Sequence, residues 1–310
     1  MSATKDPATF KLTGRPGRDW RDAVAALGNE HGFFEPLGPG HSAVFLDRGD
    51  TLLVSFESEF GIQTLSPSAT PLSFDVAQET GWSVLTVLCT GNTWYRDVSV
   101  QDFFDQLRED GFLQDFKRVI FFGAGPGGYA AGAYSAALPG ARVVMIQPQA
   151  TLSPDLTGWD DRFRDMRRLD FSGRYSYAPE MVKDAAAAHV IFDPRVPQDA
   201  MHAALFAGPN VKMHRMPFMG DMLIQDLITL KAMPYILHAA AHDRLTTHSF
   251  AKLARLRRKY VPYLRRLLAH LERSERYDLA ARLCRNQVAT RDAPYFARRL
   301  AIAEKRLRGE

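Results

Sequence analysis

The stretch Arg118–Thr151, RVIFFGAGPGGYAAGAYSAALPGARVVMIQPQAT, contains the pattern that decides the fold. An apolar run at 119–122 precedes a glycine-rich turn and an alanine-rich segment, and a second apolar run occupies 143–146. This order predicts a strand, a tight turn, a helix and a parallel strand, which form a right-handed βαβ unit. The turn then lies at the carboxyl end of a buried strand, where α/β proteins place their binding and catalytic groups.

The composition of the 310-residue chain is that of a globular protein, with 46% hydrophobic and 24% charged residues. No apolar run approaches the roughly 20 residues that a transmembrane helix needs, and the polar N-terminus does not resemble a secretory signal. Cys89 and Cys284 lie far apart, which excludes a disulfide framework and a CxxC metal or redox site. We therefore expect a cytoplasmic protein without a transmembrane segment or a bound metal.

Charge is distributed unevenly along the chain. Residues 251–310 hold 17 of the 39 lysines and arginines but only 6 of the 35 acidic residues, so this region carries a net charge of +11 and the remainder carries −7. Leucines repeat there at helical spacing, which predicts basic amphipathic helices. The simpler interpretation is a solvated helix face, and the alternative is an anionic partner: acidic polysaccharide, a membrane surface or nucleic acid. Few aromatic side chains are available for stacking on bases, so specific nucleic-acid recognition is not expected.

Periodicity divides the chain into three parts. Residues 1–40 lack a sustained pattern and are expected to be irregular, apart from a short helix at 20–27. Residues 41–235 alternate strand and helix patterns, which predicts a mostly parallel α/β domain. Residues 236–310 contain helical patterns alone and are predicted to form a helical appendage.

Local signals complete the prediction for the α/β part. Residues 43–46 and 52–56 are predicted to form a β-hairpin around the turn at 47–50. The segment 58–81 is rich in Ser, Pro and Thr and is expected to be a loop. Further strands are predicted at 83–88, 119–122, 143–146, 189–192 and 211–216.

One interpretation of the central turn is dinucleotide binding. Gly123, Gly125 and Gly128 match the GxGxxG pattern between a strand and a helix, where backbone amides can approach a pyrophosphate. The segment GAGPGGYAAG resembles the flavin-binding fingerprint of dihydrolipoamide-dehydrogenase-type flavoproteins, and this resemblance would imply FAD as the cofactor. Gln147 stands where those enzymes carry Glu, and their redox CxxxxC pair and second glycine fingerprint are missing. An FAD- or nucleotide-binding oxidoreductase is therefore kept as an alternative function.

The other interpretation is the nucleophile elbow of the α/β-hydrolase fold, a GxSxG turn between a strand and a helix. The order of predicted strands agrees with that fold, and GGYAA at 127–131 resembles the GxSMGGYAA segment of bacterial α/β-hydrolase-like proteins. The resemblance covers about residues 40–235. It implies an α/β-hydrolase-like, mostly parallel sheet with helices on both faces, in a group of proteins of which some belong to surface-glycan contexts.

The triad positions that this resemblance implies are not filled by a Ser-His-acid set. Gly125 stands at the nucleophile position, Asp193 or Asp199 supplies the acid, and Asp221 stands where the histidine belongs. Without a nucleophile and a base, ordinary serine hydrolase activity is disfavoured and no cofactor is expected. The sequence thus predicts a degenerate hydrolase, a pseudoenzyme.

The retained turn still offers a helix N-terminus to a small-molecule ligand. We expect a small carbonyl-containing or anionic ligand, with a role in surface-glycan metabolism. The predicted ligand-binding residues are the turn and nearby strand-end residues: Tyr95, Arg96, Gly123, Gly125, Pro126, Gly127, Gly128 and Gln147. A third interpretation is a non-catalytic interaction protein that acts through its Arg-rich C-terminal helices.

Overall fold

The computed structural model describes residues 12–15 and 17–309. The chain forms two compact units, one up to Lys252 and one from Leu253 onward. Of the N-terminal part that was expected to be irregular, residues 1–11 and 16 lie outside the described residues. In the described part, no helix is both long and apolar enough to cross a membrane.

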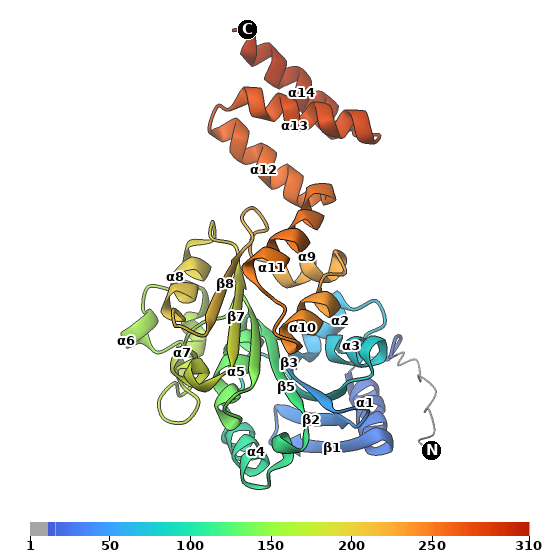
Figure 1. The fold of residues 1–310 in the computed structure, drawn as a ribbon, viewed down its shortest axis with the longest axis vertical. Helices are drawn as coiled ribbons and strands as arrows, with labels where there is room; N and C mark the ends of the chain where they lie inside the picture. The colour runs from blue at the N-terminus through green and yellow to red at the C-terminus, as the bar shows by residue number, and fades with distance from the viewer. Residues whose placement is uncertain (1–11, 16, 310) are drawn as a thin grey trace. The chain divides into compact units, whose positions relative to one another are not determined.

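An eight-stranded sheet forms the centre of the first unit (Figure 1). Its spatial order is β1-β2-β4-β3-β5-β6-β7-β8, with β2 antiparallel to both neighbours and every pair from β4 to β8 parallel. This confirms the predicted α/β fold with a mostly parallel sheet. The strands are β1 (Gly32–Leu37), β2 (His41–Leu46), β3 (Thr51–Ser58), β4 (Ser83–Cys89), β5 (Arg118–Ala124), β6 (Arg142–Ile146), β7 (Ala187–Phe192) and β8 (Val211–Arg215).

Helices cover both faces of this sheet, which is why its central strands are continuous apolar runs. Alternate side chains of β5, Val119 and Phe121, share one core with α4 and α5, while α10 contacts β5 and β6 outside that core. The helices of this unit are α1 (Gly17–His31), α2 (Glu59–Leu65), α3 (Leu72–Thr80), α4 (Val98–Glu109), α5 (Pro126–Tyr134), α6 (Pro154–Thr157), α7 (Ala178–Met181), α8 (Pro197–Leu205), α9 (Leu223–Thr229), α10 (Met233–Ala241) and α11 (Thr247–Leu253), whose last residue begins the second unit.

The predicted β-hairpin is wrong, because β4 lies between β2 and β3. The turn that follows β2 binds the start of β4 instead of closing a hairpin. Arg48 and Gly49 donate their backbone N–H groups to Ser83 Oγ at 2.9 and 3.0 Å, and Ser83 Oγ donates to the Gly49 carbonyl at 2.8 Å. The buried Ser83 hydroxyl thus holds the turn after β2 against the start of β4, the strand that lies between β2 and β3.

Two segments that were predicted to be irregular are ordered elements. Residues 17–37 form α1 and β1, so the helix predicted at 20–27 is longer and leads directly into the edge strand. Residues 58–81 form α2 and α3 rather than a loop. Side chains satisfy the first amides of both helices: Ser58 accepts from the N–H of Gly61, and Glu57 accepts from the N–H groups that begin α3. Ser58 and Glu57, at the end of β3, therefore provide acceptors for the starts of both helices.

The second unit consists of α12 (Val261–Arg273), α13 (Tyr277–Thr290) and α14 (Pro294–Leu307), preceded by a 3₁₀ segment, Ala254–Lys259. A small core of its own includes Leu268, Cys284 and Phe296. Burial raises the pKa of Cys284 to about 11, so this thiol is not activated. The predicted helical character of this region is confirmed.

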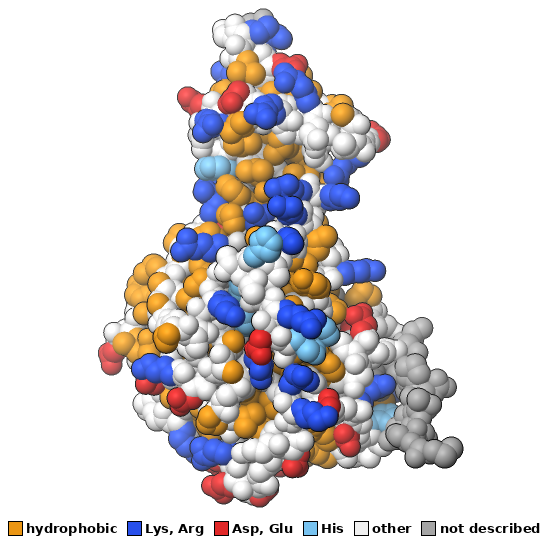
Figure 2. Space-filling model, in the orientation of Figure 1, with side chains coloured by type: hydrophobic (Ala, Val, Ile, Leu, Met, Phe, Trp, Pro, Cys, Tyr) orange, Lys and Arg blue, Asp and Glu red, His pale blue; other side chains and the backbone are white. Residues whose placement is uncertain are grey.

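Many basic side chains of the second unit take part in its own packing. Figure 2 shows Lys and Arg side chains interspersed with hydrophobic ones over these helices. Arg299 pairs with Glu272, and Arg285 pairs with Glu304 at 2.9 Å. The Arg265 guanidinium stacks 4.7 Å from the Tyr295 ring centroid. These contacts favour the solvated, self-packed interpretation of the basic helices, and an anionic partner for residues 251–310 stays a prediction.

A buried imidazole pair predicts that the fold is sensitive to acid. His189 Nδ1 and His214 Nε2 lie 2.9 Å apart in β7 and β8. Burial lowers the pKa of His214 to about 4 and, together with the neighbouring His214, lowers that of His189 to about 3. An unfolded histidine titrates near 6.5, so the unfolded chain binds more protons below that pH. Stability is therefore fully present above pH 6.5 and falls as the pH drops, by roughly 2 kcal/mol per imidazole at pH 5.

Denaturant unfolding at pH 7.5 and pH 5.0 measures this loss. In the wild-type protein the free energy of unfolding should be lower at pH 5.0 than at pH 7.5. In the double variant His189→Leu/His214→Leu this decrease should be smaller by about 4 kcal/mol. The exposed His248→Leu serves as the control and should keep the wild-type difference. An unchanged pH dependence in the double variant would contradict the assignment.

Candidate functional site

The glycine turn after β5 is shaped by two close backbone approaches. A Cβ on Gly123 would lie 2.1 Å from the carbonyl oxygen of Gly127, and a Cβ on Gly127 would lie 2.4 Å from the carbonyl oxygen of Phe56 in β3. Both positions exclude a side chain, so the strand can turn directly into α5. The predicted strand, tight turn and helix are present, and the turn stands at the carboxyl edge of the sheet.

Gly125, between these two glycines, has the conformation of a nucleophile elbow without the nucleophile. It precedes α5 with φ 52° and ψ −121°, a region that L-residues rarely occupy. A Cβ built there would meet nothing within 4 Å. The elbow therefore has the backbone conformation of a nucleophile elbow, which glycine adopts without strain, and open space where a nucleophilic side chain would lie.

Pro126 removes a hydrogen-bond donor from the elbow. In α/β hydrolases the backbone N–H of the residue after the nucleophile donates to the oxyanion. Pro126 occupies the first turn of α5 and has no N–H. Its inclusion among the predicted ligand-binding residues therefore cannot rest on a backbone hydrogen bond.

Asp193, the first candidate for the acid, follows β7 and is buried. Its Oδ2 accepts from the backbone N–H of Gly220 at 2.7 Å, and its Oδ1 accepts from that of Arg195 at 2.9 Å. Gly220 belongs to the loop after β8, where a catalytic histidine would stand, and the next residue, Asp221, is exposed. The carboxylate thus holds the backbone of that loop instead of orienting an imidazole.

Gln147 and Asp199 form a second hydrogen-bonded contact at the same edge of the sheet. Gln147 Nε2 donates to Asp199 Oδ2 at 2.6 Å and to the Gly220 carbonyl at 3.2 Å, while its Oε1 accepts from the N–H of Leu223 at 2.9 Å. Arg162 Nη1 donates to the other oxygen of Asp199 at 2.7 Å. Both predicted site residues are therefore engaged in joining the end of β6, α8 and the start of α9.

A buried aspartate–histidine pair behind this edge was missed by the sequence analysis. Asp160 Oδ2 lies 3.0 Å from His202 Nε2, and the Ala150 N–H donates to His202 Nδ1 at 3.1 Å, so Nε2 carries the proton. Although burial favours the neutral acid, hydrogen bonds from His202 and Arg162 hold the pKa of Asp160 below its usual range. Both ring nitrogens are occupied and both side chains are inaccessible, so the pair stabilises the edge. No spacing signal links two residues 42 positions apart.

Tyr95 and Arg96 are buried, and their described contacts are with other parts of the protein. The Tyr95 ring packs edge-on against Phe56 with centroids 5.3 Å apart. Arg96 donates to four backbone carbonyls at 2.7 to 3.2 Å and so holds the segment between β6 and β7: those of Asp170, Ser172, Arg174 and Tyr175. The guanidinium is occupied by protein oxygens.

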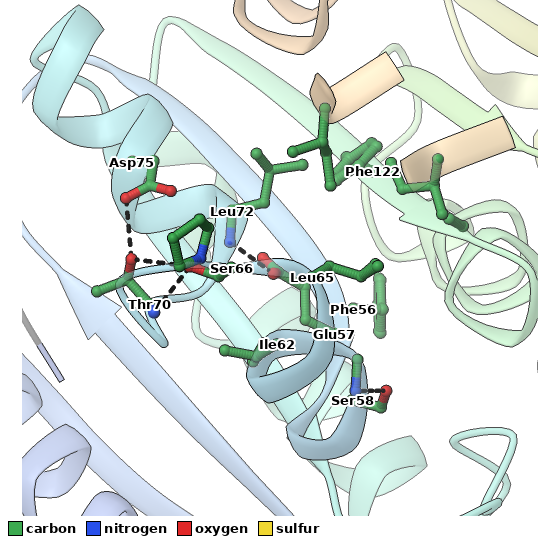
Figure 3. A pocket seen from close by; sticks show the side chains of 15 residues that line it. Phe56, Glu57, Ser58, Ile62, Leu65, Ser66, Thr70, Leu72, Asp75 and Phe122 are labelled. Atoms are coloured by element: carbon green, nitrogen blue, oxygen red, sulfur yellow. Dashed lines mark hydrogen bonds between the residues drawn. The ribbon is translucent and has the colours of Figure 1, made fainter. Parts of the chain in front are cut away.

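A cavity of about 260 Å³ adjoins the elbow at Ala124. Its walls come from the ends of β3 and β5, from α2 and the residues that lead into α3, and from α9. In Figure 3, Asp75, Thr70 and Ser66 gather on one side and Phe56 and Phe122 lie on the other. Further apolar walls are Ile62, Leu65, Leu72, Ile224 and Ile228.

Two carboxylates line this cavity. Glu57 accepts from the N–H of Leu72 at 2.7 Å and from the N–H of Ser73 at 3.0 Å; burial raises its pKa and these hydrogen bonds oppose the shift. Burial also raises the pKa of Asp75 to about 6, against a hydrogen bond from Thr70 and with a further contribution from Glu57. A cleft lined by groups with perturbed pKa values is a candidate functional site. This cavity was not predicted from the sequence, because residues 58–81 were expected to be a loop.

Strand order, the antiparallel β2 and the elbow after β5 agree with one known architecture. The chain has an α/β-hydrolase-like fold. No family model and no curated protein matches it. Among solved structures, it is similar to carboxyl esterase 2 (TmelEST2) of the mycorrhizal fungus Tuber melanosporum, with 14% identity and a TM-score of 0.43 over 67% of this chain and 84% of that one.

Two further similar structures have the same level of identity. The Pyrococcus furiosus esterase Pf2001 is 14% identical, with a TM-score of 0.41 over 65% of this chain and 88% of that one. The glycosylation associate protein (Gap123) complex of Streptococcus agalactiae is 15% identical, with a TM-score of 0.43 over 66% of this chain and 45% of that one. At this identity the likeness concerns the fold alone.

The elbow geometry predicts that its glycines differ in tolerance. Gly123→Ala places a methyl group 2.1 Å from a backbone oxygen, so the strand or helix must shift, and we expect a loss of about 3 kcal/mol. Gly125→Ala meets no atom and should cost only the positive-φ strain, about 1–2 kcal/mol. Gly173→Ala is a matched control, with φ +70° and nothing within 4 Å. Chemical denaturation that ranks Gly125→Ala as the most destabilising of the three would contradict this geometry.

Proposed function

We propose that this protein uses an α/β-hydrolase-like fold to bind a small ligand rather than to hydrolyse one. The observation that carries the proposal is the pair Gly125-Pro126, which occupies the elbow and lacks both the nucleophile and the oxyanion-binding N–H. The loop after β8 adds no imidazole, because residues 216–222 contain no histidine. Three separate requirements of acyl transfer are therefore unmet by these residues.

The ligand site that we propose is the cavity beside the elbow. The elbow conformation is present without a catalytic side chain, and the space around Gly125 is open. Ala124, the residue before Gly125, lines the cavity. A cavity with apolar walls and a few convergent polar groups is typical of small-molecule sites. The predicted role in surface-glycan metabolism is part of this proposal.

The ligand chemistry follows from the donors and acceptors available. A carbonyl or anionic ligand, as expected from the sequence, would depend on the amides that begin α5, and Pro126 contributes none. The cavity itself presents two carboxylates, Glu57 and Asp75. These groups favour a ligand that offers hydrogen-bond donors.

The dinucleotide alternative is disfavoured by the same residue. A pyrophosphate at the turn needs the first amides of α5, and the first of them belongs to Pro126. A visible absorption spectrum of the purified protein, with mass spectrometry of what denaturation releases, tests this alternative. A flavin band with a released dinucleotide would overturn the proposed function.

The proposed loss of hydrolysis predicts the outcome of an activity assay. The protein should hydrolyse p-nitrophenyl acetate and butyrate no faster than buffer, and a fluorophosphonate probe should not label it, while a serine esterase assayed in parallel does both. The double variant Gly125→Ser/Asp221→His should remain weak, because Pro126 still withholds a donor worth about 10²–10³ in kcat. Adding Pro126→Ala should raise its rate. Wild-type turnover with probe labelling would contradict the proposal.

A further inference from the structure

The cavity beside the elbow has a polar end and an apolar end, and this division identifies a class of ligand. We infer that it binds a small organic ammonium ion, with the ammonium group at Asp75 and an apolar body against Phe122 and Ile228. This inference rests on the proposed function and specifies the ligand of the same site. Its first support is charge: the cavity is lined by two carboxylates and by no Lys, Arg or His among the described residues.

The two carboxylates are not equally available to a ligand. Glu57 accepts from the N–H groups of Leu72 and Ser73 and from the Ser55 hydroxyl, so it is engaged in holding the start of α3. Asp75 receives one hydrogen bond from the described residues, from Thr70 Oγ1 to its Oδ1 at 3.0 Å. Asp75 therefore retains acceptor capacity for the N–H groups of a ligand.

The environment of Asp75 favours a cation over a neutral donor. Burial disfavours its charged form, and Glu57 from β3 and Glu79 from α3 add negative potential while Thr70 donates a hydrogen bond. A bound ammonium would supply the missing positive charge, and hydrogen bonds between charged groups are the stronger ones. A metal ion fits less well, because the described residues hold no group of three His, Cys, Asp or Glu side chains that could ligate one.

Volume limits the size of the ligand. An apolar cavity of about 150 Å³ accommodates benzene, so about 260 Å³ suits a molecule of about ten non-hydrogen atoms. The apolar end is lined by Phe56, Phe122, Ile224 and Ile228 from β3, β5 and α9. A compact aryl or branched alkyl amine matches this shape and polarity.

Isothermal titration of the full-length protein with three probes that share a phenylethyl group tests the inference. At pH 7.5, 2-phenylethylamine should bind about tenfold or more tightly than 2-phenylethanol, and 3-phenylpropionate should bind more weakly than either. At pH 5.0 the preference for the amine should shrink, since Asp75 is then largely protonated while the amine stays charged. These comparisons use the wild-type protein and do not depend on any variant.

Variants locate the ligand. Asp75→Asn should lower amine affinity to the level of the alcohol and leave alcohol binding unchanged, whereas the exposed Glu109→Gln should change neither. Ile228→Trp should abolish binding of both, because its side chain fills the cavity. Equal affinity of the wild-type protein for amine and alcohol would overturn the ammonium ligand and leave the cavity as a ligand site. An amine preference that survives Asp75→Asn would overturn the placement of the ammonium group at Asp75. Failure of all three probes to bind the wild-type protein would overturn the cavity itself as the ligand site.

Discussion

The close backbone contact between β3, β5 and α5 is the constraint on which the rest of this structure depends. Gly123 and Gly127 bring the first turn of α5 against the end of β5 and against the Phe56 carbonyl, at distances that leave no room for a Cβ. Gly125 lies between these two glycines in a conformation that favours glycine, and the elbow stands at the carboxyl edge of the sheet. The cavity follows from it, because β3 and β5 end beside each other there and expose Phe56 and Ala124 to the same space.

Residues at this edge that a hydrolase would use for proton transfer are used here to hold loops together. The Asp193 carboxylate binds the backbone of Gly220, and the Gln147 amide binds both that residue and Asp199. Each of these bonds satisfies a buried polar group, so the edge is stable without a ligand.

The cavity differs from this edge because one of its two carboxylates has few hydrogen-bond donors. Glu57 has several donors, whereas Asp75 has one and a pKa raised to about 6 by burial. Two partly buried carboxylates that lack a cation beside them cost stability. Such an arrangement is typical of a site that a ligand completes.

Local periodicity in the sequence was enough to predict the strands from β2 to β8 and the turn between β5 and α5, and the residue types alone place Gly125 and Pro126 in that turn. The sequence did not predict β1, α2 and α3. Only the tertiary structure decided that β4 separates β2 from β3, since that pairing depends on a contact between Ser83 and a distant turn. It also decided that Gln147 and Arg96 are occupied within the protein. Glu57 in β3 and Asp75 in α3 line one cavity, and no local sequence pattern links the two positions. Only the packing of the elements brings them together.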